Sequence, residues 1–138
     1  MSAPLEGIRV VEMTSVVLGP YACQMLGDLG ADVIKIEPPG GDTNRNLGPR
    51  RKHSDMGSLF LTCNRNKRSV TIDLAQPTGQ ALVRRMAAGC DVLVENFKVG
   101  DMARYGLDAT TLLSIQPRLV YCSITGFGQT GPYCDRAG

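Results

Sequence analysis

Apolar and polar residues alternate along the chain in a pattern that predicts short strands separated by helices. Residues 8–11 and 33–36 are rich in β-branched side chains, as buried parallel strands are. Between them, we expect Pro20 in the first turn of a helix, with Gly19 as its cap. Gly30 is placed to end that helix in the left-handed conformation. A strand–helix–strand unit this short predicts a right-handed parallel crossover.

The same unit indicates where a ligand would bind. Apolar residues spaced three and four apart predict the buried face of the helix, namely Tyr21, Ala22, Met25, Leu26 and Leu29. In parallel sheets, ligands bind beyond the carboxyl ends of the strands. Residues 14–18 and 37–42 occupy those ends here, so they are the first candidates for chemistry.

Further strands and helices are predicted along the rest of the chain. Strands are expected at residues 69–74, 91–97 and 119–125, and helices at residues 77–89, 101–105 and 108–115. Residues 38–58 contain Pro, Gly and Asn without periodicity, and they are predicted to form a loop. Strands that recur with helices between them predict an α/β fold with a mainly parallel sheet.

Composition narrows the class of protein without identifying a reaction. The 138 residues fit about one domain, and a net charge of +2 implies no polyanionic partner such as nucleic acid. We see neither a signal peptide nor a segment long enough to cross a membrane. The five cysteines form no C-x-x-C pair and there is one histidine, which argues against a zinc site. Such thiols are typical of a reducing compartment, so a cytoplasmic location is expected.

A basic segment follows the second predicted strand. Seven of the fifteen lysines and arginines lie in it, namely Arg45, Arg50, Arg51, Lys52, Arg65, Lys67 and Arg68. One interpretation is a solvated basic surface. The other is a site for a phosphorylated ligand, where Arg and Lys neutralise a few localised charges. Nucleic acid fits less well, because few aromatic residues are interleaved.

A glycine motif near the last predicted strand suggests a dinucleotide when it is taken alone. Gly126, Gly128 and Gly131 spell G-x-G-x-x-G, but the residues after them do not open an apolar helix. The first crossover, where this motif normally lies, has only Gly19. Glu37 does stand where a ribose-binding acid would be. We therefore expect a loop that borders a site, and a nucleotide-binding oxidoreductase module stays an alternative.

No catalytic group follows from the residue types alone. Four acids lie in or at the ends of strands, namely Glu12, Glu37, Asp73 and Glu95. Each is either a buried acid with a raised pKa or a structural group that pairs with a neighbouring Lys or Arg. His53 has no visible partner, and Cys122 lies within a strand. Residue chemistry thus predicts an α/β domain suited to phosphate, with no assigned nucleophile.

Four segments of the sequence resemble the signature blocks of a known family. They are VVLGPYACQMLGDLGADVIKIEPPGGD (residues 16–42), NRNKRSVTIDL (64–74), DVLVENFKVG (91–100) and PRLVYCSITGFGQTGPYCDRAG (117–138). In this order they are similar to the class III coenzyme A transferases of the CaiB/BaiF type. That family contains formyl-CoA and carnitine-CoA transferases and also the 2-methylacyl-CoA racemases, which are a second alternative here.

The resemblance implies a fold, a reaction and an assembly. Members have a Rossmann-like large domain and a small domain, and two subunits interlock as a homodimer. They move CoA from an acyl-CoA to a free carboxylic acid through an aspartyl-CoA thioester, with no metal and no tightly bound cofactor. Residues 1–138 would be the amino-terminal, CoA-binding part of the large domain. The small domain and the catalytic aspartate would lie downstream, so this chain alone is expected to be inactive.

The resemblance also implies CoA contacts at matching positions. They are Val17 and Leu18; Ile72, Asp73 and Leu74; Asn96, Phe97 and Lys98; and Arg104. Two positions depart from the formyl-CoA transferases, which have glutamine in place of Val17 and arginine in place of Pro38. The first departure argues against formyl or oxalyl specificity. For the second, Arg45 is expected to supply the missing nucleotide contact.

Overall fold

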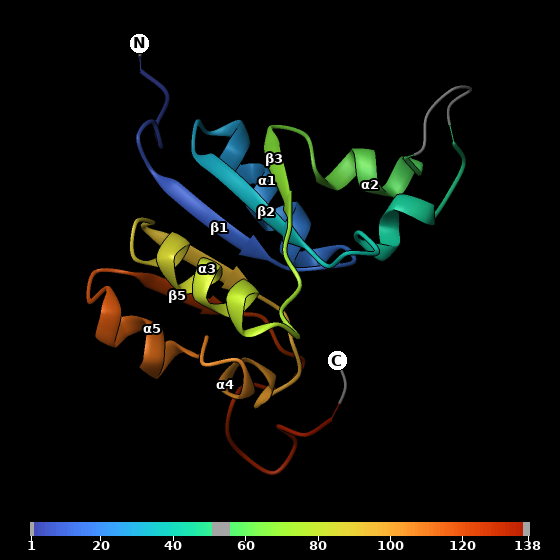
Figure 1. Cartoon of the computed structure of the whole chain (residues 1–138). Helices are drawn as coiled ribbons and strands as arrows, with labels where there is room; N and C mark the ends of the chain where they lie inside the picture. Colours follow the sequence, from blue (N-terminus) through green and yellow to red (C-terminus); the bar gives the residue numbers. More distant parts are fainter. Residues whose placement is uncertain (1, 51–55, 137–138) are drawn as a thin grey trace.

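The computed structural model describes residues 2–50 and 56–136, in which five parallel strands form one sheet (Figure 1). The strands are β1 (Arg9–Met13), β2 (Asp32–Glu37), β3 (Lys67–Thr71), β4 (Val92–Glu95) and β5 (Val120–Ser123). Their order across the sheet is β3-β2-β1-β4-β5. The chain adds β2 and β3 on one side of β1, and then β4 and β5 on the other side. The order in which strands are added therefore reverses between β1 and β4, although all five strands remain parallel. The predicted α/β fold with a parallel, Rossmann-like sheet is confirmed.

Helices cover both faces of this sheet. They are α1 (Leu18–Asp28), α2 (Ser58–Cys63), α3 (Pro77–Ala87), α4 (Asp101–Arg104) and α5 (Ala109–Ile115), with a short 3₁₀ helix, η1 (Thr43–Asn46). Helix α1 packs on one face, and α3 and α5 pack on the other (Figure 1). Alternate strand residues enter opposite cores: Val10 contacts the α1 side, and Val11 contacts the α3 side.

Helix α1 differs from its prediction in both its start and its buried face. It begins at Leu18, and its buried residues are Gly19, Pro20, Cys23 and Gln24. Tyr21, predicted to be buried, is 51% exposed, as is Met25. The cause is close packing at the start of the helix, because a β-carbon on Gly19 would lie 2.4 Å from the Thr14 β-carbon. The face that packs on the sheet therefore begins with two small residues and continues with Cys23 and Gln24, and of the predicted face Leu26 is partly buried against the same core.

The described residues between β2 and β3, 38–50 and 56–66, contain more regular structure than the predicted loop. They contain η1 and also α2, a helix that the sequence analysis missed. Strand β3 begins at Lys67, two residues earlier than predicted, and the amine of Lys67 is buried on the α1 side of the sheet. Gly30 does follow α1 with a left-handed φ of 104°, and the side chain of Asp108 does cap α5, as predicted.

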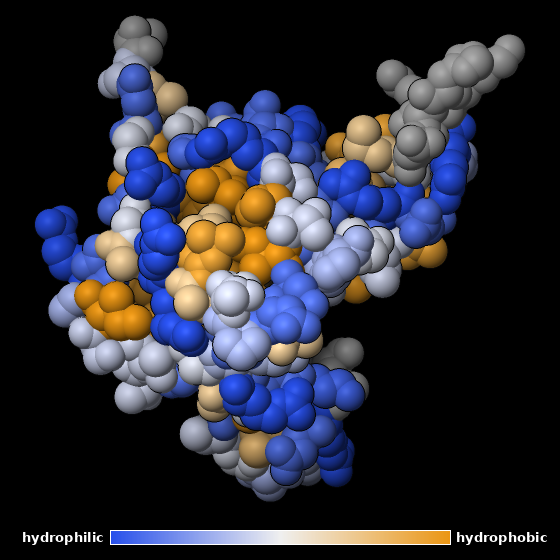
Figure 2. Space-filling model, in the orientation of Figure 1, coloured by the Kyte–Doolittle hydropathy of each residue, from blue (hydrophilic) through white to orange (hydrophobic). Residues whose placement is uncertain are grey.

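Part of the sheet on the α3 side carries apolar surface. Figure 2 shows apolar side chains gathered near the centre of this face. Ile34 of β2 and Val70 of β3 are only partly buried there, beside the core formed under α3. Helix α3 therefore covers the middle of the sheet more completely than it covers the β2–β3 side.

Candidate functional site

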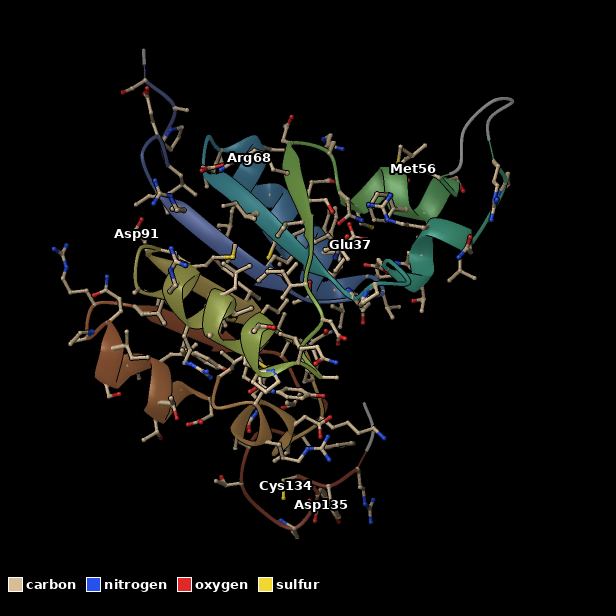
Figure 3. The ribbon with its side chains drawn as sticks, in the orientation of Figure 1. Glu37, Met56, Arg68, Asp91, Cys134 and Asp135 are labelled. Carbon is tan, nitrogen blue, oxygen red and sulfur yellow. The ribbon has the colours of Figure 1, made fainter. Side chains whose placement is uncertain are left out.

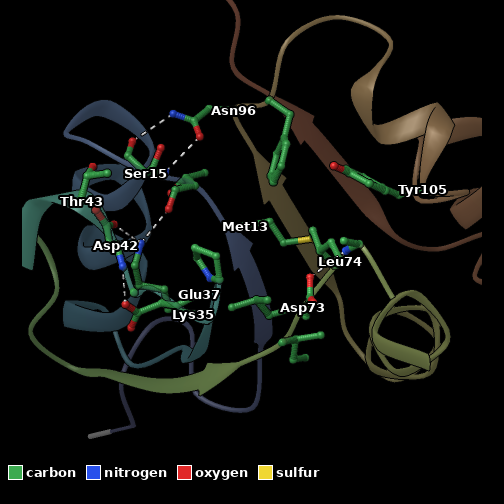
Figure 4. A pocket seen from close by; sticks show the side chains of 17 residues that line it. Met13, Ser15, Lys35, Glu37, Asp42, Thr43, Asp73, Leu74, Asn96 and Tyr105 are labelled. Atoms are coloured by element: carbon green, nitrogen blue, oxygen red, sulfur yellow. Dashed lines mark hydrogen bonds and ion pairs between the residues drawn. The ribbon is translucent and has the colours of Figure 1, made fainter. Parts of the chain in front are cut away.

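Two cavities lie side by side at the carboxyl ends of the strands. The first has a volume of about 420 Å³ and lies among the ends of β1, β2 and β3 and Tyr105 (Figure 4). The second, of about 600 Å³, lies between the turn after β1 and residues 124–136. Ser15, Asn96 and Phe97 line both. The two cavities therefore meet beyond the ends of β1 and β4, where the strand order reverses. Parallel sheets typically bind ligands at such a point.

Most of the predicted CoA contacts come together at these cavities. Eight of the ten line one or both, namely Val17, Leu18, Ile72, Asp73, Leu74, Asn96, Phe97 and Lys98. The other two, Arg45 and Arg104, are not among the lining residues. Arg104 is exposed on α4 and forms an ion pair of 2.9 Å with Asp101. Contact of these residues with CoA stays a prediction.

A buried ion network lies beside the first cavity. The amine of Lys35 is 3.0 Å from Glu12 Oε1 and 2.9 Å from Asp42 Oδ2, and it donates to the Thr14 carbonyl at 2.7 Å. Lys67 Nζ is 2.7 Å from the other carboxylate oxygen of Glu12. Only 1% of the Lys35 side chain is exposed. Buried charges require such partners, so Glu12 is a structural group that joins β1, β2 and β3.

Glu37 ends β2 as a carboxylate that is fixed by several donors. Its oxygens accept two bonds from the Arg45 guanidinium at 2.6 and 2.7 Å, one from Ser69 Oγ at 2.5 Å and one from the Asp42 amide at 2.8 Å. Burial alone would raise the pKa of Glu37, but the bonds from Arg45, Ser69 and Asp42 outweigh it and lower the pKa to about 2. Glu37 lies between the sheet and the η1–α2 segment (Figure 3). It is therefore neither a general acid at neutral pH nor a free ligand for a ribose.

The basic segment is largely neutralised by acids from other parts of the chain. Arg45 binds Glu37, Lys67 binds Glu12, Arg65 lies 2.5 Å from Asp28, and Arg68 lies 2.6 Å from Asp32. Arg50 donates to the Asn46 side chain at 2.7 Å. Arg51, Lys52 and His53 lie outside the described residues. For the four paired cations, the geometry favours structural and surface roles over the phosphate site considered from charge alone.

Aromatic side chains form one wall of the first cavity. Phe97 and Tyr105 contact each other edge to face, with ring centroids 6.4 Å apart. The Phe97 amide donates to Glu95 Oε2 at 2.8 Å, which fixes the chain as it leaves β4. Tyr105 was not among the predicted site residues, because the sequence of residues 101–105 predicts only a short helix and does not indicate a ligand contact. Together with Met13 and Leu74, these rings make a mainly apolar wall.

The glycine motif borders the second cavity, as expected. Gly126 lines it, whereas Gly128 and Gly131 adopt left-handed φ angles of 84° and 99° in open space. In the described residues, no helix follows the motif. It therefore lacks the strand–turn–helix context of a dinucleotide site.

The described part of the chain contains neither a metal-binding cluster nor a membrane-spanning helix. No group of three or more His, Cys, Asp or Glu side chains in residues 2–50 and 56–136 is placed to hold a metal ion. None of the helices in these residues combines the length and the hydropathy needed to cross a membrane.

Comparison with known proteins gives consistent matches over the whole chain. The sequence profile of CoA-transferase family III matches residues 5–138. A succinate–glutarate CoA-transferase of Agrobacterium fabrum is 53% identical over 98% of this chain and 35% of its own. A human succinyl-CoA:glutarate CoA-transferase is 45% identical over 98% of this chain and 31% of its own.

A solved structure gives the same match in three dimensions. The crystal structure of a CAIB/BAIF family protein from Brucella suis superposes with a TM-score of 0.95 at 50% identity. The superposed region comprises all of this chain and 37% of the Brucella suis chain. The chain thus spans about a third of the length of the relatives it matches.

Proposed function

This chain belongs to CoA-transferase family III, and from that premise we propose that it forms the CoA-binding part of an enzyme that moves coenzyme A between an acyl-CoA and a free carboxylic acid. One observation carries the proposal. Two adjoining cavities lie where the strand order reverses between β1 and β4. They are lined by eight of the ten residues that the family resemblance assigned to CoA. A long, bent ligand with an apolar arm suits two joined cavities better than one compact ligand does.

In this proposal the two cavities hold different parts of CoA. The thioester end lies at Val17 and Leu18 in the second cavity. The first cavity, with Phe97 and the backbone of residues 72–74, holds the pantetheine arm or the adenine against its apolar wall.

The cations near the cavities differ in their availability to the phosphates. Arg104 is exposed and its ion pair with Asp101 is on the surface, so exchanging Asp101 for a phosphate costs little. Lys98 is also exposed but lines the second cavity, at the thioester end. Arg45 is the weakest candidate of the ten, because a phosphate would have to displace it from buried Glu37.

The proposed chemistry is covalent catalysis by an aspartate. Its carboxylate attacks the acyl-CoA carbonyl and expels the CoA thiolate, which leaves an acyl–aspartyl anhydride. The thiolate then attacks the aspartyl carbonyl, which releases the donor acid and forms aspartyl-CoA. The acceptor carboxylate attacks this thioester and expels the thiolate again. The thiolate finally takes the new acyl group and frees the aspartate.

We place this aspartate outside residues 1–138, in the part of the relatives that this chain does not match. Of the carboxylates that line the two cavities, Glu37 and Asp42 are already held by Arg45 and Lys35, and Asp73 Oδ1 accepts from the Ala75 amide at 2.9 Å. Asp135, which lines the second cavity, belongs to the last of the family's signature blocks, and we do not assign it as the nucleophile. The residues here therefore bind and orient CoA, and the nucleophile comes from elsewhere.

For the acids exchanged, we propose dicarboxylates such as succinate and glutarate. The relatives named above act on succinate, succinyl-CoA and glutarate. In this chain the second cavity contains two cationic side chains, Lys98 and Arg136, either of which can meet the distal carboxylate of such an acid. The side chain of Val17 supplies no hydrogen bond for a formyl or oxalyl group.

The test uses this chain and a chimaera in which it replaces the matching third of the Agrobacterium fabrum relative. We expect this chain alone to bind CoA without turnover. The chimaera is expected to transfer CoA from succinyl-CoA to glutarate and to accumulate a protein-bound CoA thioester when the acceptor is withheld. A folded chimaera that binds no CoA, or that transfers it without such a thioester, would contradict the proposal.

A further inference from the structure

We propose that Asn96 is a positioning residue, which acts on the thioester end of CoA by holding the turn after β1. The inference rests on the proposed function, because it assigns a role within the same site. The turn comprises residues 15–18, of which Val17 and Leu18 line the second cavity.

The side-chain amide of Asn96 forms a two-point clamp on Ser15. Its Oδ1 accepts from the Ser15 amide at 3.0 Å, and its Nδ2 donates to the Ser15 carbonyl at 3.0 Å (Figure 4). The backbone pairing of β1 with β4 ends where Met13 faces Glu95. The Asn96 side chain therefore continues the link between the two segments beyond the last paired residues, at the point where the two cavities meet.

The turn needs such support because its backbone is strained. Val16 adopts a φ of 69°, which is a left-handed conformation that β-branched residues rarely take. Its carbonyl accepts a hydrogen bond from the side chain of Asn44, which is fully buried. The preceding Thr14 carbonyl accepts from Lys35 at 2.7 Å. Three successive carbonyls are thus each held by a side chain from a different segment of the fold.

Of these three side chains, Asn96 is the one that both holds the turn and lines the two cavities. Lys35 and Asn44 are buried within the ion network and η1. Asn96 is only partly buried and lines both cavities. Because its amide is directed at Ser15, its orientation is set by the turn, and its removal frees the turn without removing a charge or a core side chain.

The test compares Asn96→Ala with Asn46→Ala, a control that removes an asparagine whose Oδ1 accepts from exposed Arg50. Three probes are titrated: CoA, 4′-phosphopantetheine and adenosine 3′,5′-bisphosphate. Amide exchange of the turn is measured without ligand. For Asn96→Ala we expect about tenfold faster exchange at Ser15 and about tenfold weaker binding of CoA and phosphopantetheine. Binding of the adenosine bisphosphate and the melting temperature should match the control.

Other outcomes separate the possible failures. Weaker CoA binding with unchanged exchange at Ser15 would mean that Asn96 acts on CoA by direct contact alone and not through the turn, which overturns the inference. Equal weakening of all three probes together with a lower melting temperature would mean general structural loss, which also overturns it. If CoA binds the unaltered chain and Asn96→Ala matches the control in every respect, the inference alone fails. If none of the probes binds the unaltered chain, the proposed function fails as well.

Discussion

Six charged side chains on the α1 side of the sheet determine what the residues near the site can do. They are Glu12, Lys35, Glu37, Asp42, Arg45 and Lys67. Three are acidic and three are basic, so their charges cancel. Burial also lowers the pKa of Lys67, which the attraction of Glu12 partly offsets. These groups hold the carboxyl edge in place and leave recognition to the residues around them.

The state of Glu37 predicts how stability depends on acid. Its pKa is about 2 in the folded chain against an ordinary value of 4.5. The stability that Glu37 contributes is therefore complete above pH 4.5 and is lost as the pH falls toward 2, by on the order of 3 kcal/mol. Urea unfolding between pH 2 and 6 should show a steeper loss in the wild type than in Glu37→Gln. Glu6→Gln, at an exposed residue, is the control. Parallel curves for the wild type and Glu37→Gln would contradict this role.

The cysteines should differ sharply in reactivity. Burial, and then the charge of Glu12, raise the pKa of Cys23 to about 12, and burial raises that of Cys90 to about 11. Cys122 is exposed. With limiting iodoacetamide at pH 8, peptide mapping should find Cys122 alkylated well before Cys23 and Cys90, because reaction requires access and the thiolate. Equal labelling of all three in the native protein would show that the buried pair is accessible.

At the scale of elements, the start of α1 depends on Gly19. A β-carbon there would lie within 2.4 to 2.7 Å of three side-chain atoms of Thr14, so Gly19→Ala must push the helix away from β1. We expect a loss of about 2 kcal/mol of unfolding free energy. Gly40→Ala is the matched control, because nothing lies within 4 Å of the added carbon. Chemical denaturation of both variants would measure the difference, and equal stability would mean that this contact does not position the helix.

The sequence predicted strands better than it predicted helix faces. Val33, Ile34 and Ile36 are β-branched and apolar, so local composition is enough to predict a strand there. The face of α1 was predicted correctly for Leu26 and wrongly for Tyr21 and Met25. Gly19 and Pro20 pack closely without being large, so a prediction based on bulky apolar residues does not detect them. Helix α2 was missed because its six residues, which directly follow the predicted loop, are too few to show a helical period.

The site shows the same limit for a different reason. Family motifs placed eight of the ten expected residues at the cavities. The pairing of Glu12 with Lys35 depends on the register of β1 with β2, and the partners of Arg65 and Arg68 are Asp28 and Asp32, from distant segments of the chain. Local sequence does not contain that information. The basic segment therefore suggested a phosphate site, whereas the fold pairs these arginines with acids.

At the scale of the whole molecule, the functional edge and the apolar face are distinct. The cavities lie at the carboxyl ends of the strands, whereas the apolar side chains in Figure 2 lie on the α3-side face of the sheet. The chain also matches only about a third of its relatives' length. The central claim therefore concerns which ligand the carboxyl edge of the sheet binds. Whether the complete enzyme transfers CoA is a separate question.

The most direct test is an NMR titration of the ¹⁵N-labelled chain with CoA. The account predicts saturable shifts at the amides of residues 16–18, 72–74 and 96–98. It predicts none at residues 30–32 and 89–91, which lie near the amino ends of the strands. Shifts that are absent at high CoA concentration, or that centre on the amino ends, would contradict the claim that the carboxyl edge is a CoA site.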